Sequence, residues 1–511
     1  MAGGARLTNE GADVDVQNKP VVVVGAGPCG LVAACELLRL GVPVRVLDAE
    51  PEPAKGSRAI ILWPPTLEVL AELGVLTDAE ARGVRAKALA YHMGDGKVLR
   101  IELGSDNEPL LLPQEETGRL LVAALEKLGG RVEQSTRVVE VHERGDSVVV
   151  HAMGPDGVES IEAAWLIGAD GIGSTVRQQS GVEFAGDAVP TTFLLAEGEL
   201  SGAFDRNEVH YFLRANGVML LSPLPEGRVR VSGPIAPDLP VTEETAQRVL
   251  DERGPGGLRF TTFTTLGTFT SQERIAATLR QGRMFLVGDA AHVHSAVGGQ
   301  GLNLGVQDGR NLAWKLAGVI DGRFAPAVLD SYSVERRAAA EQVVKATSRM
   351  AKQAVVGPIG SRVRNAVWAL LDATGALRSW YAPMLAGRLT RYPDVLFGTR
   401  SPRDQRRGRS RALPQRGSRT PTWVPDPAEP TAGLRLLTLG VSGGDLDRAG
   451  RALADRFPGV LAHEHFTGRG GAGFLLLRPD GFVADSGASI EALTGIDRAL
   501  SVIAETSNSP R

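Results

Sequence analysis

The sequence has little of what would mark a secreted, membrane-spanning or nucleic-acid-binding protein. Its 511 residues include only two cysteines, Cys29 and Cys35, which lie on different faces of one predicted helix and form no redox or metal motif. No apolar run approaches the roughly 20 residues that span a membrane. The formal net charge of −3 predicts no polyanionic partner. These absences favour a protein of the reducing cytoplasm that binds neither nucleic acid nor membrane.

What the chain has is enough apolar sequence for several cores. Hydrophobic residues make up 43% of it, and its length predicts two to four domains. Residues 1–19 lack the apolar segment of a signal peptide, so we expect a flexible tail there.

The period of the apolar residues changes along the chain. Residues 21–50 read as a strand, a glycine turn, a helix and a second strand, which is the opening βαβ unit of a doubly wound sheet. Residues 59–76 are expected to be mostly helical. The segments 88–112 and 184–270 are rich in short strands and predict an antiparallel sheet, with a helix near 242–253. Helices are expected from 303 to about 390.

The last part of the chain begins with a basic stretch. Residues 400–419 contain eight arginines and one aspartate, among prolines and glycines. Such a stretch is typical of a nucleic-acid tail or of a solvated linker. Because it lacks interleaved aromatic residues, we expect a linker over 396–420. Residues 421–511 then predict a compact α/β module without a Cys-x-x-Cys motif.

The first of three glycine-rich motifs is GAGPCG, at residues 25–30. Gly25 permits a tight turn, Gly27 lets the backbone approach a pyrophosphate, and Gly30 allows close packing of the helix on the strand. Asp48 ends the second strand, where its carboxylate can accept hydrogen bonds from ribose hydroxyls. Alone, this motif fits FAD or NAD, and Asp48 could instead be a solvated acid.

The second motif is GADGIGSTVR, at residues 168–177. Asp170 lies in a glycine-flanked turn before a predicted helix, and Arg177 lies within that helix. The pair could help to place a cofactor. The alternative is structural, with Asp170 capping the helix and Arg177 forming an ion pair, and both roles can coincide.

The third motif is GDAAHVHSAVGGQGLN, at residues 288–303. Asp289 can bind a polyhydroxylated chain such as ribityl. The glycines at 298–301 precede a helix, so the N–H groups of Leu302 and Asn303 can face the N1–C2=O edge of a flavin, where negative charge develops on reduction. His292 and His294 are two positions apart, which is poor spacing for a metal, so we expect structural roles and no metal site.

Taken in this order and spacing, the three motifs resemble the FAD-dependent aromatic hydroxylases, in their phenol-hydroxylase and polyketide-hydroxylase branch. GSRA at 56–59, Gln114 and YSVERR at 332–337 add to the resemblance, which covers 20–345 firmly and 420–511 loosely. It implies an α/β fold that has a Rossmann-like FAD-binding domain, an inserted antiparallel-sheet substrate domain and a C-terminal thioredoxin-like domain without redox cysteines. The FAD-binding domain would comprise 20–87, 113–183 and 271–395, and the substrate domain 88–112 and 184–270.

The same resemblance implies which residues bind FAD. Arg58 and Gln114 would contact its flavin side, and Val138 would meet the adenine through its backbone. The expected cofactor-binding residues are Gly25, Gly27, Pro28, Gly30, Asp48, Arg58, Gln114, Val138, Asp170, Asp289, Gly299, Gly301, Leu302 and Asn303.

The implied activity is monooxygenation. NADH or NADPH would reduce FAD, O2 would form a flavin hydroperoxide, and one oxygen would pass to a phenolic or polycyclic aromatic substrate, such as a natural-product intermediate. Baeyer–Villiger insertion or epoxidation on the same scaffold is an alternative, and a non-catalytic nucleotide-binding protein is another. A homo-oligomer is left open.

Two departures from the family pattern bear on the substrate. Ala296 stands where relatives commonly have proline beside the reactive edge of the flavin, and the Pro-Pro pair after Trp63 suggests a bend that faces the pocket or a packed surface tryptophan. His210, Tyr91 and Tyr211 are candidate bases, with core packing as the alternative for each. Alternation along 208–225 places His210, Phe212 and Leu221 on one face of the predicted sheet, without showing whether that face meets the substrate. The expected substrate contacts are Trp63, Tyr91, His210, Phe212, Leu221, Ala296 and Val297.

Overall fold

The computed structural model describes residues 19–53, 59–94, 96–214, 216–295, 297–354, 356–396, 413–425, 432–467 and 471–504. A six-stranded sheet in the order β18-β19-β12-β1-β2-β8 organises the first part of the chain. Its strands are parallel except for the edge strand β18. Their bounds are β1 (Val21–Val24), β2 (Val44–Leu47), β8 (Val132–Glu133), β12 (Trp165–Gly168), β18 (Arg280–Gln281) and β19 (Met284–Leu286).

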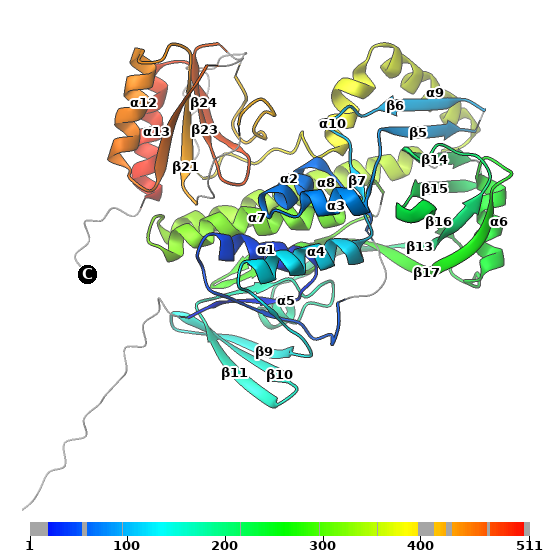
Figure 1. Cartoon of the computed structure of the whole chain (residues 1–511), viewed down its shortest axis with the longest axis horizontal. Helices are drawn as coiled ribbons and strands as arrows, with labels where there is room; N and C mark the ends of the chain where they lie inside the picture. The colour runs from blue at the N-terminus through cyan, green and yellow to red at the C-terminus, as the bar shows by residue number, and fades with distance from the viewer. Residues whose placement is uncertain are drawn as a thin grey trace, which may run out of the picture.

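Three helices cover one face of this sheet, namely α1 (Pro28–Arg39), α4 (Gln114–Lys127) and α7 (Gly301–Ile320) (Figure 1). α1 and α7 approach closely because two glycines of α7 face α1. A Cβ at Gly309 would lie 3.0 Å from the Ala33 nitrogen, and one at Gly305 would overlap the Cys29 sulfur. The two free cysteines therefore both lie on α1, as predicted, with Cys29 at the α1–α7 contact.

A three-stranded antiparallel sheet projects from this part of the molecule, at the bottom of Figure 1. It consists of β9 (Arg137–Arg144), β10 (Ser147–Gly154) and β11 (Gly157–Ala163). The helix α5 (Thr175–Gln179) follows β12 and begins at Ser174, whose hydroxyl accepts from the Arg177 N–H.

The region expected to be mostly helical at 59–76 begins instead with a short strand. A small sheet joins β3 (Ile61–Leu62), β7 (Leu110–Leu111) and β4 (Val84–Arg85), and the helices α2 (Pro64–Glu72) and α3 (Leu76–Arg82) lie between β3 and β4. Pro64 and Pro65 occupy the first turn of α2, where a missing N–H costs no hydrogen bond. The Pro-Pro pair thus starts the helix.

An eight-stranded sheet in the order β20-β17-β13-β16-β15-β14-β5-β6 forms the second large layer. One face packs against α6 (Glu243–Arg253) through Phe212, Leu221 and Leu250. The opposite face carries Tyr91 and Tyr211 toward the later helices. The strands are β5 (Ala88–Met93), β6 (Val98–Glu102), β13 (Phe184–Ser201), β14 (Glu208–Arg214), β15 (Gly217–Pro223), β16 (Arg228–Ile235), β17 (Arg259–Ala276) and β20 (His292–Val293).

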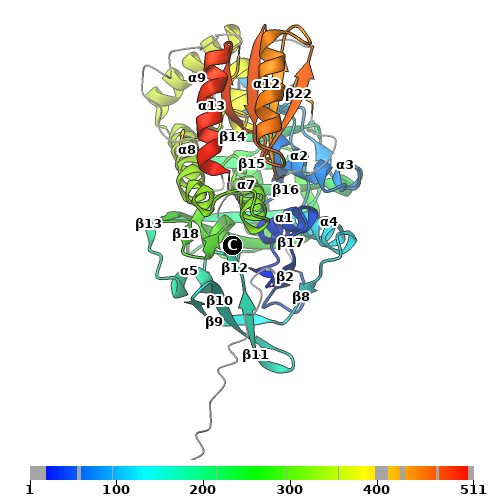
Figure 2. The ribbon, with the colours of Figure 1, turned by 90° about the vertical axis from the view of Figure 1, so that its left-hand side faces the viewer.

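A run of helices follows α7. It comprises α8 (Asp330–Ala354), α9 (Pro358–Ala373), the π-helical turn η5 (Leu377–Tyr381) and α10 (Ala382–Leu385). Figure 2 shows α8 beside α7, with α9 beyond it at the end of the molecule that also holds α12 and α13. Among the helices described, none combines the length and apolar composition needed to cross a membrane.

The C-terminal unit is a four-stranded sheet in the order β22-β21-β23-β24. β21 and β22 are parallel and the other pairs antiparallel, and both helices of the unit lie on one side of the sheet in Figure 1. The elements are β21 (Leu434–Leu439), α12 (Asp445–Arg456), β22 (Leu461–Phe466), β23 (Gly473–Leu477), β24 (Val483–Gly487) and α13 (Ile490–Ile503).

We expected a solvated linker over 396–420. Within the described residues 413–420, the prediction that this segment is solvated is wrong. Leu413 is buried, and the Gly417 N–H donates to the Val483 carbonyl at 2.8 Å. Arg419 is 8% exposed and donates to the Gln307 side chain at 2.6 Å. Of the arginines that suggested a solvated segment, the two that the structure describes, Arg416 and Arg419, donate to the buried side chains of Asp485 and Gln307. Composition alone does not reveal such acceptors.

Candidate active site

The first glycine motif makes a turn that only glycine fits. Gly25 has φ +102°, and a Cβ there would collide with the Ala169 carbonyl. A Cβ at Gly30 would overlap the Gly25 carbonyl oxygen, whereas a Cβ at Gly27 would meet nothing within 4 Å. There is therefore no room for a side chain at Gly25 or Gly30, whereas the space beside Gly27 is open.

Asp48 ties this turn to the end of β2. Its carboxylate accepts from the Ala26 N–H at 2.5 Å and from the Glu50 N–H at 2.9 Å. Since a carboxylate has about four acceptor positions, these bonds leave capacity for a hydroxyl donor.

The second motif has a structural role that also reaches the third. The Asp170 carboxylate accepts from the Ser174 hydroxyl at 2.5 Å and from the Val176 N–H at 3.2 Å, so it caps α5. Burial raises the pKa of Asp170, against the lowering effect of these hydrogen bonds. The Arg177 guanidinium donates to the carbonyls of Ala290 (2.9 Å) and Ile172 (2.7 Å). It thereby ties the second motif to the turn that carries Asp289.

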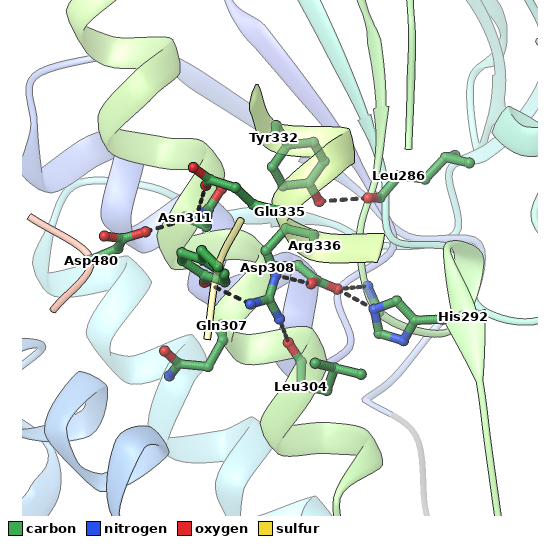
Figure 3. Close-up of polar contacts among 12 residues, drawn as sticks. Leu286, His292, Leu304, Gln307, Asp308, Asn311, Tyr332, Glu335, Arg336 and Asp480 are labelled. Atoms are coloured by element: carbon green, nitrogen blue, oxygen red, sulfur yellow. Dashed lines mark hydrogen bonds and ion pairs between the residues drawn. The ribbon is translucent and has the colours of Figure 1, made fainter. Parts of the chain in front are cut away.

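The turn η3 (Gly288–Ala290) presents Asp289 as an exposed carboxylate and is anchored from behind by Asp308 of α7. Asp308 accepts from the Gly288 N–H at 3.0 Å, from His292 Nε2 at 2.7 Å and from Arg336 Nε at 2.6 Å. Figure 3 shows its carboxylate between His292 and Arg336. Burial raises the pKa of Asp308, but His292 and Arg336 outweigh it, so the net pKa is below the usual value.

The start of α7 is held by the side chain of Asn303. Its Oδ1 accepts from the Trp63 N–H (2.7 Å) and the Thr66 hydroxyl (2.8 Å), and its Nδ2 donates to the carbonyls of Ile61 and Gly299, both at 2.8 Å. All of these partners belong to the protein. Asn303 can therefore contribute its backbone N–H to a ligand, while its side chain fixes where α7 begins.

Trp63 supports the same loop from the interior. It is 2% exposed, and its indole N–H donates to the Gly298 carbonyl at 3.0 Å. The sequence suggested a pocket-facing or surface tryptophan, and the structure places it in the core behind the glycine loop. The Pro-Pro start of α2 turns Trp63 inward.

His294 lies at the same loop. Its Nδ1 is 2.8 Å from the Ser295 carbonyl, and a Cβ built at Gly301 would lie 3.7 Å from its Nε2. Burial lowers the pKa of His294 from 6.5 to about 4, outweighing the opposite effect of the Ser295 carbonyl.

This lowered pKa predicts an acid-sensitive fold. Between pH 6.5 and 4 the unfolded chain binds a proton at His294 that the folded chain does not, so stability should fall as the pH drops through that window. In that window, His294→Gln should make the free energy of unfolding depend less steeply on pH, by up to about 1.4 kcal/mol per pH unit. The reason is that the unfolded variant no longer takes up a proton at this position. The measurement is the denaturant midpoint of both proteins from pH 7.5 to 4.5. Equal slopes would contradict the assignment.

A cavity of about 800 Å³ opens between the glycine loop, the eight-stranded sheet and the helical segments α8, α9 and η5. Its aromatic wall is a cluster in which Tyr91 stacks on Tyr211 at 4.8 Å and meets Trp368 edge-on at 4.9 Å. The Tyr91 and Tyr381 hydroxyls are 3.0 Å apart. Burial raises the pKa of Tyr91, so its phenol stays protonated at neutral pH.

Of the substrate contacts expected from the sequence, Tyr91 and Val297 line this cavity. Trp63, His210, Phe212 and Leu221 do not line it. Ala296, like Arg58 of the expected cofactor set, lies outside the described residues. The alternation that grouped His210, Phe212 and Leu221 on one face is correct, but α6 covers that face, and the neighbouring residues Tyr211, Leu213 and Leu220 face the cavity.

His210 also has other partners that explain its position. Its Nε2 lies 2.7 Å from the Asp205 carbonyl and its Nδ1 lies 3.2 Å from His92 Nε2. Both rings pack against Phe212 on the face turned away from the cavity. Core packing was the alternative for each of the three candidate bases. It describes His210, whereas Tyr91 and Tyr211 line the cavity.

The sequence reading missed several polar residues that line the cavity. Arg230 lines the cavity and forms an ion pair with Glu197, with both side chains nearly buried. Glu273 and Ser348 also line it, and the Glu273 carboxylate accepts from the Ser348 hydroxyl at 2.9 Å. Arg364 reaches the cavity from α9. Arg230 and Glu197 lie opposite each other on adjacent strands. Charged residues within otherwise apolar strands were the feature of the sequence that could have indicated this pair.

The remaining expected cofactor residues lie around the three motifs. Gln114 begins α4 and its Oε1 accepts from the Ala59 N–H at 3.3 Å, while Val138 lies buried on β9.

α1 and α7 both begin without a side-chain cap, at Gly27 and Gln300. Their first N–H groups are therefore available to an anion or to the carbonyl edge of a ring, and the open side of Gly27 leaves room for one. These features fit a bound dinucleotide. Among the residues described, no cluster of His, Cys, Asp and Glu could hold a metal ion.

Comparison with known proteins agrees with this fit. A family model described as FAD binding domain matches residues 18–347. The 6-methylpretetramide 4-monooxygenase of Streptomyces rimosus is 34% identical over 67% of this chain, a match that spans 64% of that relative, less than two thirds of its length. The 12-dehydrotetracycline 5-monooxygenase/anhydrotetracycline 6-monooxygenase of Streptomyces rimosus is 31% identical over 94% of this chain and 97% of its own length.

A solved structure extends the likeness to the whole chain. The anhydrotetracycline hydroxylase OxyS from Streptomyces rimosus superposes with a TM-score of 0.74 at 28% identity, covering 95% of this chain and 99% of its own. The family match includes all three glycine motifs, and the mixed α/β fold is shared through the C-terminal unit. The chain belongs to the FAD binding domain family and is an FAD-dependent monooxygenase.

Proposed function

We propose that this protein uses NADH or NADPH and O2 to hydroxylate a phenolic or polycyclic aromatic substrate, of the kind found among natural-product intermediates. The observation that carries the proposal is the cavity of about 800 Å³, which has an apolar and aromatic lining and ends at the Gly298–Gly299 loop. That volume lies in the range of small-molecule sites. Relatives named for tetracycline-type substrates, rifampicin and pentachlorophenol support an aromatic substrate.

FAD, when bound, supplies the redox and oxygen chemistry, and the chain positions the reactants. We propose that the α1 turn with Gly25, Gly27 and Gly30 holds the pyrophosphate and that Asp48 binds the adenosine ribose. Asp289 would bind the ribityl chain, and the N–H groups at the start of α7 would meet the N1–C2=O edge of the ring.

The cavity supplies orientation and excludes water. The Tyr91–Tyr211–Trp368 cluster offers flat faces for a planar substrate, and its buried phenols can donate a hydrogen bond to a substrate oxygen. The sheet and α9 both form walls of the cavity, and these walls reduce the access of water to a substrate bound between them.

The domain organisation follows the same proposal. We propose that 20–87, 113–183 and 271–395 form the FAD-binding domain, that 88–112 and 184–270 form the substrate domain, and that 421–511 form a thioredoxin-like unit. The absence of cysteine from the unit's sequence excludes dithiol chemistry there. The strand order β22-β21-β23-β24, with one parallel pair, supports this assignment.

The direct test is a screen of phenols and polycyclic phenols for stimulated NADPH and NADH oxidation by the FAD-loaded protein. We expect a product that has gained one oxygen atom, identified by mass spectrometry, and NMR of the product distinguishes ring hydroxylation from Baeyer–Villiger insertion or epoxidation. A protein that retains FAD but oxygenates no aromatic compound in the screen would refute the proposal.

The size of the cavity gives a second prediction. Val218 lines it from β15, and Val218→Phe should lower kcat/KM for a polycyclic substrate roughly tenfold, because added volume in a filled site costs about 1–3 kcal/mol. A single-ring phenol should be affected little. The matched control is Val218→Ala, which enlarges the cavity. Equal losses for large and small substrates, measured by steady-state kinetics, would contradict this role of the cavity.

A further inference from the structure

The turn that joins β23 to β24 of the C-terminal unit reaches into the FAD-binding part of the chain. Arg478 binds Glu335 of α8 through two hydrogen bonds, at 2.7 and 2.8 Å. Asp480 accepts from the Asn311 side chain of α7 at 2.7 Å. The β23–β24 turn therefore contacts both long helices that support the third glycine motif.

These contacts belong to a fully buried charge cluster, which we call the α7–α8 clamp. Lys315 donates to Glu335 at 2.7 Å, and Arg478 also donates to Asp480 at 2.9 and 2.7 Å. The four ionised side chains are 0 to 4% exposed, and two positive charges balance two negative ones. The clamp consists of Asn311, Lys315, Glu335, Arg478 and Asp480.

The clamp adjoins the anchor of the Asp289 turn. Arg336, next to Glu335 on α8, donates to Asp308 at 2.6 Å and to the Leu304 carbonyl at 2.9 Å. Asp308 lies one helical turn before Asn311 and holds the Gly288 N–H and His292. Figure 3 shows Asp480, Asn311 and Glu335 beside Arg336, Asp308 and His292. The C-terminal turn is thus connected to Gly288, the residue before Asp289, through these side-chain contacts and through the backbone of α7 and α8, which links the clamp to the anchor.

We propose that Arg478 is a positioning residue for FAD binding: by clamping α8 onto α7, it sets Arg336 and Asp308 and so holds the Asp289 turn ready for the cofactor. The C-terminal unit then serves the FAD site without touching the ligand. The proposal depends on FAD binding and not on the identity of the aromatic substrate.

The chemistry of the clamp favours positioning over simple stabilisation. Buried ion pairs contribute little stability compared with apolar packing of the same volume, and they are best known for fixing one arrangement among several. Arg478 fits this role because its guanidinium holds two carboxylates in fixed directions while lying over the Tyr392 ring at 4.9 Å. Each pair requires α7, α8 and the C-terminal turn to keep one register.

The test uses the full chain with FAD as the probe. Arg478→Lys keeps the charge but loses the two-pronged contact, and Arg478→Met removes the charge. We expect FAD dissociation to become roughly 3-fold faster in Arg478→Lys and roughly 10-fold faster in Arg478→Met, with faster amide exchange over 288–295 in both. The matched control is Arg456→Met, which breaks an exposed ion pair with Asp497 in the same unit and should change neither quantity.

A double-mutant cycle separates positioning from general destabilisation. If the clamp acts through the anchor, the effects of Arg478→Lys and Asp308→Asn on FAD affinity should be less than additive, because either change releases the same turn. Additive effects, or unchanged FAD release and exchange at 288–295 in folded Arg478→Lys, would overturn the proposal. If Arg478→Met does not fold, Arg478→Lys and Asp480→Asn decide the question alone. A parent protein that binds FAD but oxygenates no aromatic compound would instead count against the proposed function and leave the positioning role of Arg478 unaffected.

Discussion

Gly30→Ala is expected to prevent assembly of the FAD site, whereas Gly27→Ala should leave the fold intact and weaken FAD binding. A Cβ at Gly30 would overlap the Gly25 carbonyl and lie 3.0 Å from the Ala169 Cβ. Because backbone atoms cannot move aside as a flexible side chain can, we expect a loss of at least about 3 kcal/mol in stability. At Gly27 the same Cβ meets no protein atom within 4 Å.

The contrast between the two glycines is the informative result. For Gly27→Ala we expect apo stability within about 0.5 kcal/mol of the parent, but roughly 10- to 100-fold weaker FAD binding, because the methyl group projects where a pyrophosphate would approach. Thermal melting of the apo proteins and FAD titration measure the two effects separately. If Gly27→Ala destabilised the apo protein as strongly as Gly30→Ala, the open side of the turn would not be a ligand site.

Asp289→Ala is expected to weaken FAD binding by roughly 10- to 100-fold, since a hydrogen bond to a charged group contributes about 1.5–3 kcal/mol. Asp289 is exposed on η3, while Asp308, Gly288 and Arg177 hold the turn from behind. The turn should therefore stay in place when the carboxylate is removed, and the variant loses an acceptor for ligand hydroxyls. Asp289→Asn, which keeps one acceptor oxygen, should fall between the parent and Asp289→Ala.

The control for this prediction is Asp321→Ala. Asp321 is also an exposed carboxylate, but it lies at the far end of α7, where it pairs with Arg323. FAD affinity, measured by the quenching of flavin fluorescence, should not change in this variant. Unchanged affinity in folded Asp289→Ala would show that Asp289 is not a cofactor ligand.

The glycine motifs could be recognised in the sequence because their constraints are local. Gly25 needs a positive φ and Gly30 must let its helix approach the turn, and both requirements involve residues within a few positions of each other. The helix α6 (Glu243–Arg253) was predicted near 242–253, and helices were expected where α1 and α7 lie, for the same reason, since amphipathic periodicity is a property of a short segment.

The faces of the middle sheet show where this local reasoning stops. Alternation correctly separated His210 and Phe212 from Tyr211 and Leu213 on β14. It could not tell which set α6 would cover and which would line the cavity, because both sets contain apolar and aromatic residues. Burial of one face depends on α6, which comes after β14, β15 and β16 in the chain, so the assignment needed the structure.

The sequence by itself determined the dinucleotide turn, the doubly wound start of the fold and the family, because short motifs encode backbone shape. Only the tertiary structure decided the inward turn of Trp63, the cavity wall, the packing of 413–420 and the clamp at Arg478. Each of these is a contact between segments far apart in the chain. Their partners are selected by shape and charge after folding, and no local pattern records that choice.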